Sequence, residues 1–275
     1  MGDEKKLKEL RKKIFLTGYR GGIAHLASSF SCLEILYALY GKGILRYDAG
    51  YPGWRERDRL ILSKGHAGLA LYAVMCENGL MKEEAFASFL APGSQIGGEP
   101  CMRDLEGVEA STGSLGHGLS MGAGMAMAQR MDRISAKTYV VLGDGECEEG
   151  TVWEAAISAS AFGLDNLIAV LDCNQIQKMD TVEAIIAQTN WKEKWEAFGW
   201  AVREVDGHDV EALCRCFSEE NRTGKPLLVI AQTVKGKGVS IMENNPNWHF
   251  KLPNKKELRC FLEELEISQD EIETR

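Results

Sequence analysis

The 275-residue sequence predicts an α/β protein with a doubly wound, mostly parallel sheet that carries helices on both faces. Short apolar runs bounded by turn residues alternate with helix-like segments along most of the chain, and this alternation is typical of parallel sheets. At this length, a composition that is 45% hydrophobic can bury a full core. We therefore expect a single domain over residues 1–275.

Charge and cysteine patterns exclude several classes of function. The net charge of −8 leaves no basic surface for a nucleic acid backbone. No apolar run approaches the length of a membrane span, and the charged N-terminus has no apolar signal region. The eight cysteines are scattered and form no Cys-x-x-Cys pair, which favours buried, reduced thiols over a zinc site. We expect a cytoplasmic protein with neither nucleic acid nor membrane as a partner.

The first forty residues predict two helices joined by a glycine-rich elbow over residues 17–31. Ser29 or Ser31 can cap the second helix, which is predicted over residues 32–40. His25 lies in the elbow, where a structural histidine is more common than a catalytic one. Position alone therefore favours a structural role for His25 over a catalytic one.

A buried strand is predicted over residues 59–63, with a turn that leads into a helix over residues 69–78. Lys64 and His66 lie in that turn. Because parallel sheets bind their ligands beyond the carboxyl ends of the strands, this position favours a functional role.

An acidic helix is predicted over residues 82–90, followed by an irregular connection over residues 91–109. Loops of that length in compact domains are usually functional. A glycine-rich turn over residues 111–120 then leads into a helix of small residues, 121–130, which indicates close packing against other backbones, either in the core or at a subunit interface. Free amides at such a turn can bind phosphate oxygens, although ordinary glycine turns are common.

The central unit is strand, glycine turn, helix and strand. An apolar strand over residues 139–142 ends at Gly143-Asp144-Gly145, and a helix over 149–163 leads to a second strand that ends at Asn174. A right-handed crossover makes the two strands parallel neighbours, so Asp144 and Asn174 meet at one edge of the sheet. A carboxylate and an amide carbonyl suit Mg²⁺, which takes further ligands from phosphates. The unit predicts a metal–diphosphate site.

Two more strands, over residues 200–205 and 226–234, flank a helix over residues 210–220. Lys235 follows the last strand and His249 lies in the next loop, both at the predicted ligand edge. The polar C-terminal helix, residues 255–267, is expected to face solvent.

Two other phosphate-binding motifs do not fit the Gly143-x-Gly145 turn. The dinucleotide fingerprint needs a third glycine where Cys147 and Glu148 stand, and the P-loop needs a lysine before Thr151. The acidic run over residues 146–149 is also poor lining for phosphates, unless its side chains turn toward solvent or a partner.

Four segments resemble the diphosphate-binding domain of transketolases, and they occur in that family's order. In addition, the spacing of Asp144 and Asn174 resembles the thiamine diphosphate signature. The length of the chain resembles that of this domain in transketolases that are split into two polypeptides. The segments are residues 62–67 (LSKGHA), 108–120 (VEASTGSLGHGLS), 143–150 (GDGECEEG) and 234–239 (VKGKGV).

The resemblance implies a thiamine diphosphate cofactor with Mg²⁺ or another divalent cation such as Ca²⁺ or Mn²⁺. Asp144, Asn174 and the backbone carbonyl of Ile176 would hold the cation. His25, His66 and His249 would assist proton transfers at the substrate. Residues near the cofactor would be Lys64, His66, Gly113, Leu115, Gly145, Asn174 and Lys235.

The activity implied is transfer of a two-carbon ketol unit from a ketose, as a phosphate or related sugar, to an aldehyde acceptor. In this family the activating glutamate belongs to a pyrimidine-binding domain, which we do not find in this sequence. The resemblance therefore implies a C-terminal, pyrimidine-binding partner subunit, an α2β2 heterotetramer, and a subunit contact near Glu149.

One position departs from the family pattern. Transketolases commonly have Gly-His-Pro where this chain has Gly98-Glu99-Pro100. A carboxylate accepts hydrogen bonds and carries charge, whereas a neutral histidine can also donate. Glu99 is therefore a candidate for substrate specificity.

Two alternatives stay open from the sequence. The α-subunit of a thiamine-dependent 2-oxo acid dehydrogenase shares the Asp–Asn metal site, although the Ser-Lys-Gly-His-Ala segment argues against it. A non-catalytic cofactor-binding module is the other, and the presence of His25, His66 and His249 argues against it.

Overall fold

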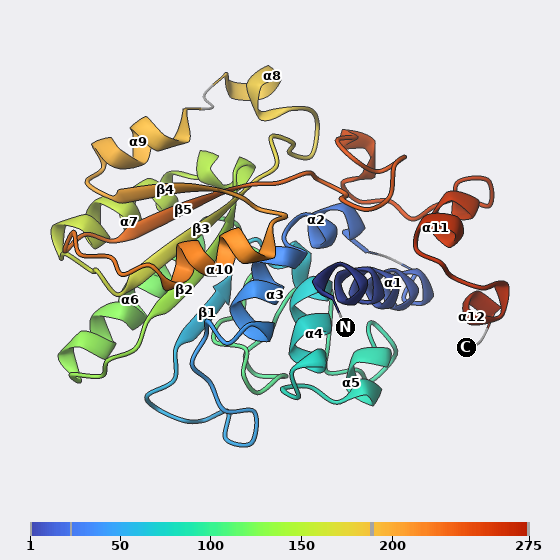
Figure 1. Cartoon of the computed structure of the whole chain (residues 1–275), viewed down its shortest axis with the longest axis horizontal. Helices are drawn as coiled ribbons and strands as arrows, with labels where there is room; N and C mark the ends of the chain where they lie inside the picture. Colours follow the sequence, from blue (N-terminus) through green and yellow to red (C-terminus); the bar gives the residue numbers. More distant parts are fainter. Residues whose placement is uncertain (1, 23, 188–189, 274–275) are drawn as a thin grey trace.

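Five strands form one parallel sheet in the computed structural model, which describes residues 2–22, 24–187 and 190–273 (Figure 1). Every neighbouring pair of strands is parallel, as predicted for a doubly wound sheet. In spatial order the strands are β1 (Arg59–Leu62), β2 (Thr138–Gly143), β3 (Leu167–Cys173), β5 (Leu227–Gln232) and β4 (Ala201–Asp206).

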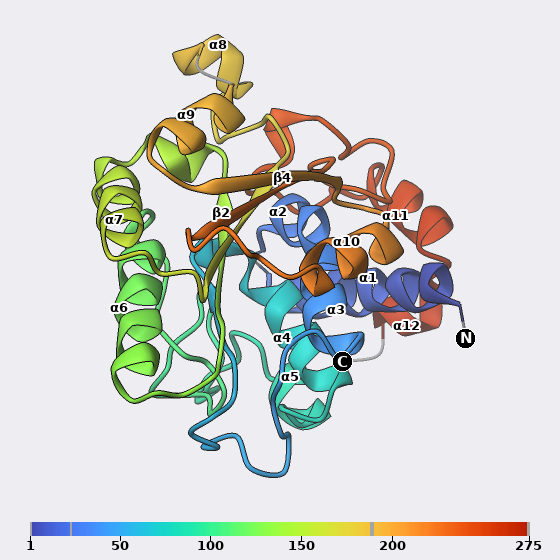
Figure 2. The same cartoon turned by 60° about the vertical axis from the view of Figure 1, so that its left-hand side comes forward.

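Helices cover both faces of this sheet, because successive strand residues point to opposite sides (Figure 2). Tyr139 and Val141 of β2 belong to one buried cluster, whereas Val140 and Leu142 belong to the other. The first cluster contains residues of α1 (Asp3–Arg20), α2 (Leu26–Ser31), α3 (Leu33–Gly41), α4 (Gly68–Glu77) and α10 (Val210–Ser218), and the second contains residues of α6 (His117–Met131), α7 (Gly150–Ala161) and α9 (Trp191–Ala197).

The small-residue helix α6 packs directly on the sheet, as its composition predicted. A Cβ atom at Gly118 would overlap with the Ser63 side chain, and one at Gly122 would overlap with Val140. By contrast, a Cβ at Gly124 would meet nothing within 4 Å. Only the glycines that face the sheet are therefore required by packing.

The N-terminal elbow differs from the prediction. Residues 26–31 form α2, and α3 has Cys32 at its N-cap without a side-chain hydrogen bond, so neither Ser29 nor Ser31 caps it. Ser31 Oγ instead donates a hydrogen bond to Asp172 Oδ1 over 2.7 Å. Asp172, a buried residue of β3, therefore binds the Ser31 hydroxyl that would otherwise cap α3.

The sequence analysis gave no helix for one segment and the wrong environment for another. α8 (Val182–Ile186) and α9 were not predicted, although Thr181 and Asn190 cap them. The C-terminal helix, observed as α11 (Leu258–Glu264) and α12 (Gln269–Glu273), is not merely a solvated face: the fully buried Phe261 stacks on Phe15 with ring centroids 4.8 Å apart. The remaining helix is α5 (Glu83–Ala87), and none of the described helices is long and apolar enough to cross a membrane.

Candidate active site

A cavity of about 310 Å³ lies at the carboxyl edge of the sheet. Lys64, Asp144, Asn174 and Lys235 enter it from the segments that follow β1, β2, β3 and β5. All of the metal, cofactor, catalytic and specificity residues predicted from the sequence line this one cavity. Glu149 does not line it and is exposed at the start of α7.

Asp144 and Asn174 meet because β2 and β3 are neighbours, with Gly143 opposite Asp172. Asp144 is buried, and its two carboxylate oxygens accept hydrogen bonds from Gly145 N over 2.8 Å and Gln175 N over 2.5 Å. Burial raises the pKa of Asp144 to about 6, and the nearby Asp172 adds to the shift. A cation at this position would relieve both effects.

Asp172 lies beneath this site and fixes its geometry. Its carboxylate forms a buried ion pair with Lys64 and also accepts hydrogen bonds from Ser31, Thr233 and the Asn174 side chain. Burial alone would raise the pKa of Asp172, but Lys64 and the hydrogen bonds hold that pKa below its usual value. Because Asn174 Nδ2 also donates to Ser31 Oγ over 3.1 Å, both amide protons of Asn174 have partners. Its carbonyl oxygen Oδ1 accepts one hydrogen bond, from Ile176 N over 3.1 Å, and keeps a second lone pair with which it can bind a cation.

Lys235 contacts the backbone carbonyl of Ile176, which is the third predicted metal ligand. Its ammonium donates to the Ile176 carbonyl over 2.7 Å and lies 3.1 Å from His249 Nδ1. Burial lowers the pKa of Lys235 to about 8, with a further contribution from Lys64. The Ile176 carbonyl is therefore oriented toward positive charge inside the cavity.

These residues fit a hard divalent cation. A carboxylate, an amide oxygen and a backbone carbonyl are oxygen ligands that Mg²⁺ accepts, together with phosphate oxygens and water. Two observations support a cation here. The pKa of Asp144 is raised, so a nearby positive charge would stabilise its carboxylate, and the Ile176 carbonyl already binds the Lys235 ammonium.

Three histidines from distant parts of the chain form a cluster at the cavity. The ring centroids of His25, His66 and His249 lie 5.2 to 5.5 Å from one another. Burial and the nearby lysines lower the pKa of His25 to about 4 and that of His249 to about 3, and they lower the pKa of His66 well below its usual value. The three imidazoles are therefore neutral at neutral pH in the protein without ligand.

Glu146 was missed by the sequence analysis. The acidic run was expected to turn away, but Glu146 is buried and accepts hydrogen bonds from Gly143 N over 3.0 Å, Gly116 N over 2.9 Å and Ser63 Oγ. The Gly116 amide at the start of α6 is therefore not free for a phosphate oxygen. Nothing in the sequence separates Glu146 from the other acidic residues of this run, Glu148 and Glu149.

Lys178 was also missed. It follows Ile176 by two positions, is exposed, and lines the cavity with Lys64 and Lys235. Its charge contributes to the lowered pKa values of His25 and His249. Nothing in its sequence context distinguishes it from an ordinary loop lysine.

Comparison with known proteins gives consistent matches. Residues 19–259 match the family model described as the transketolase, thiamine diphosphate binding domain. The chain is 41% identical over 244 residues to one of the subunits of the apulose-4-phosphate transketolase of Phocaeicola vulgatus, a match that covers 88% of this chain and 86% of that protein. It is 40% identical over 223 residues to a 6-deoxy-6-sulfo-D-fructose transketolase subunit from a Clostridium species, a match that covers 81% of each.

Solved structures show the same relationship. The transketolase of Pichia stipitis in complex with a sedoheptulose phosphate has a TM-score of 0.88 and 27% identity over 98% of this chain. This chain spans 41% of the length of that protein. The family match and the curated relatives show that this chain belongs to the transketolase family and carries its thiamine diphosphate-binding domain.

Proposed function

We propose that this chain is the cofactor-binding subunit of a two-chain transketolase, which moves a two-carbon ketol unit from a ketose donor to an aldehyde or aldose acceptor. The observation that carries the proposal is the single cavity that joins the Asp144–Asn174–Ile176 oxygens to the cluster of three histidines. The names of the relatives support the transketolase over a non-catalytic module and over the α-subunit of a 2-oxo acid dehydrogenase.

Asp144, Asn174 and the Ile176 carbonyl hold the cation, Mg²⁺ or a similar divalent ion, and through it the diphosphate. Residues at the cofactor are the two lysines Lys64 and Lys235, together with His66, Gly113, Leu115 and Gly145. Bound thiamine diphosphate supplies the carbon nucleophile that carries the two-carbon unit.

His25, His66 and His249 accept and donate protons at the substrate's hydroxyl and carbonyl oxygens. Burial, and after it the nearby lysines, disfavour the imidazolium form. Anionic groups brought by cofactor and substrate offset the contribution of the lysines.

Glu99 selects among sugars. It lines the cavity, and as a carboxylate it accepts hydrogen bonds from hydroxyl groups without donating any. The relatives act, by their names, on apulose-4-phosphate and on 6-deoxy-6-sulfo-D-fructose, both anionic sugars. A ketose phosphate or related anionic sugar fits a cavity that three lysines line.

The partner is a C-terminal, pyrimidine-binding subunit that supplies the activating glutamate, and the assembly is α2β2, with Glu149 near the subunit contact. Two relatives that span most of this chain are themselves named subunits. Residues 1–275 form one domain and act in the cytoplasm, where the eight free thiols stay reduced.

Reconstitution tests the function. We expect ketol transfer from a panel of ketose phosphates only when this chain is mixed with its pyrimidine-binding partner. Transfer by the purified chain alone at ordinary transketolase rates would contradict the proposal.

Removal of the metal ligand tests the site. Asp144→Ala should abolish the Mg²⁺-dependent rise in Tm that thiamine diphosphate causes, which corresponds to about 2.7 kcal/mol at a hundredfold excess over Kd. Asp132→Ala is the control, because Asp132 pairs with the exposed Arg55 on the surface. An unchanged Tm shift in Asp144→Ala would disprove the metal assignment.

A further inference from the structure

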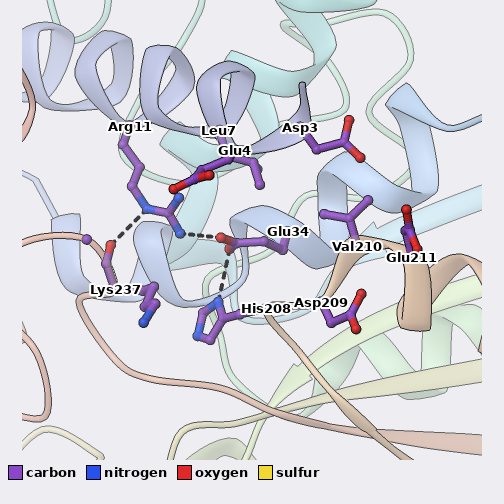
Figure 3. A pocket seen from close by; sticks show the side chains of 11 residues that line it. Asp3, Glu4, Leu7, Arg11, Glu34, His208, Asp209, Val210, Glu211 and Lys237 are labelled. Atoms are coloured by element: carbon purple, nitrogen blue, oxygen red, sulfur yellow. Dashed lines mark hydrogen bonds and ion pairs between the residues drawn. The ribbon is translucent and has the colours of Figure 1, made fainter. Parts of the chain in front are cut away.

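A second cavity, of about 490 Å³, adjoins the loop that follows β5 (Figure 3). We call residues 233–238 the β5 loop. It carries Lys235, and Gly236 and Gly238 have φ values of +82° and +94° within it. A Cβ at Gly236 would lie 2.6 Å from the Met242 carbonyl oxygen. Only glycine fits these two positions of the loop, which lets the chain turn closely around Met242.

Two side chains of the second cavity, Arg11 and His208, contact this loop. Arg11 Nε donates to the Lys237 carbonyl over 2.8 Å, and Arg11 Nη2 donates to Glu34 Oε1 over 2.5 Å. The Val234 amide donates to His208 Nε2 over 2.8 Å. Glu34 joins the two, as Figure 3 shows, because its Oε2 lies 3.2 Å from His208 Nδ1 in a close polar contact.

The hydrogen bonds determine the state of His208. Because Val234 N can only donate, Nε2 must be unprotonated, which places the proton of the neutral ring on Nδ1, facing Glu34. Burial would raise the pKa of Glu34, but the His208 and Arg11 contacts hold it below its usual value, so Glu34 is a carboxylate. Glu34 thus orients the imidazole with its lone pair toward the β5 loop.

The turn that carries His208 is built to reach that loop. Gly207 N donates to the Gln232 carbonyl over 2.8 Å, and a Cβ at Gly207 would overlap with Thr233. Asp206 Oδ1 accepts from His208 N over 2.8 Å. Only a glycine permits this close approach, and it brings His208 next to Val234.

We propose that His208 is a positioning residue for Lys235: by accepting the Val234 amide hydrogen bond, it holds the Lys235 ammonium on the Ile176 carbonyl and beside His249. This inference rests on the proposed function, in which Ile176 is a ligand of the cation that binds the diphosphate. His208 itself does not line the cofactor cavity. It acts through one backbone hydrogen bond to the residue that precedes Lys235.

The test compares two amides of different length. A glutamine at position 208 can place its carbonyl oxygen where Nε2 lies, whereas an asparagine reaches only the Nδ1 position. Both are measured in the full-length chain by calorimetric titration of thiamine diphosphate with Mg²⁺, well below Tm. We expect His208→Asn to weaken binding by roughly ten- to a hundredfold, as residues that orient metal ligands typically do. His208→Gln should stay within about threefold of the unsubstituted chain.

A local readout accompanies the affinity. Amide hydrogen exchange at Val234 should accelerate in His208→Asn and remain slow in His208→Gln. Glu211→Gln is the control, because this exposed side chain lines the same cavity and pairs with Arg215 at 3.7 Å. It should change neither affinity nor exchange.

The outcomes separate the inference from the proposed function. Unchanged affinity in His208→Asn, or an equal loss in both His208 variants, would overturn the positioning role. A lowered Tm in His208→Asn with full affinity would show a structural role only and would also overturn it. Failure of the unsubstituted chain to bind thiamine diphosphate, both alone and together with its partner subunit, would refute the proposed function, and Val234 exchange would still test the His208 contact.

Discussion

Removal of the Lys64 ammonium tests the buried network beneath the metal site. The exposed fractions of the Lys64 and Asp172 side chains are 2% and 0%, so both charges lie out of contact with water. Lys64→Met keeps the length and apolar stem of the side chain but leaves Asp172 without its counter-charge. Removing one partner of a buried ion pair typically costs about 3–5 kcal/mol.

The structure places the expected loss at the lower end of that range. Asp172 keeps hydrogen bonds from Ser31 Oγ at 2.7 Å, Thr233 Oγ1 at 2.5 Å and Asn174 Nδ2 at 3.2 Å. We therefore expect a loss of about 3 kcal/mol in the free energy of unfolding at pH 7, or roughly 6–12 °C in Tm. Without Lys64, burial raises the pKa of Asp172 above its unfolded value, so the variant should lose stability as pH rises and be less impaired at pH 5 than at pH 8.

Urea unfolding measured by circular dichroism gives these free energies. The control is Lys192→Met, because Lys192 pairs with Glu204 at 3.6 Å with about half of each side chain exposed. Such a surface pair contributes about 0–1 kcal/mol. The double variant Lys64→Met/Asp172→Asn should recover part of the loss. If Lys64→Met were as stable as Lys192→Met, the buried pair would not have the role that its geometry indicates.

The remaining predictions concern α6 and the histidines. Gly122→Ala should destabilise the protein by about 1–3 kcal/mol because its Cβ overlaps with Val140. Gly124→Ala on the same helix should stabilise it by about 0.4–1 kcal/mol, because its Cβ meets no other atom. Thermal unfolding of the two variants checks both predictions, and a change in Tm of the same sign in both would contradict the packing. In the protein without ligand, NMR should show His25 titrating near pH 4 in place of its usual 6.5. Because the unfolded chain takes up that proton first, stability should fall as pH drops from 6.5 to 4, and His25→Gln should lessen the fall; a midpoint near 6.5 would contradict the burial argument.

Local patterns were sufficient to predict the sheet. The central strands are continuous apolar runs, because helices bury both faces of a parallel sheet. Their predicted limits lie within two residues of the observed strands. The crossover rule then places Asp144 beside Asn174, because chirality leaves one arrangement for a strand–helix–strand unit. Where a segment's role depends on distant contacts, prediction failed: Ser31 binds Asp172 from 141 positions away, and Phe261 packs on Phe15.

The sequence by itself determined the parallel sheet, the meeting of Asp144 and Asn174 at its edge and, through the resemblance, which residues share the cavity. Only the tertiary structure decided the protonation and partners of those residues. It showed that Glu146 turns inward, that burial and three lysines keep the histidines neutral, and that His208 contacts the β5 loop. The physical reason is that strand and helix patterns depend on neighbours in sequence, whereas pKa values and hydrogen-bond partners depend on burial and on charges brought together from distant segments.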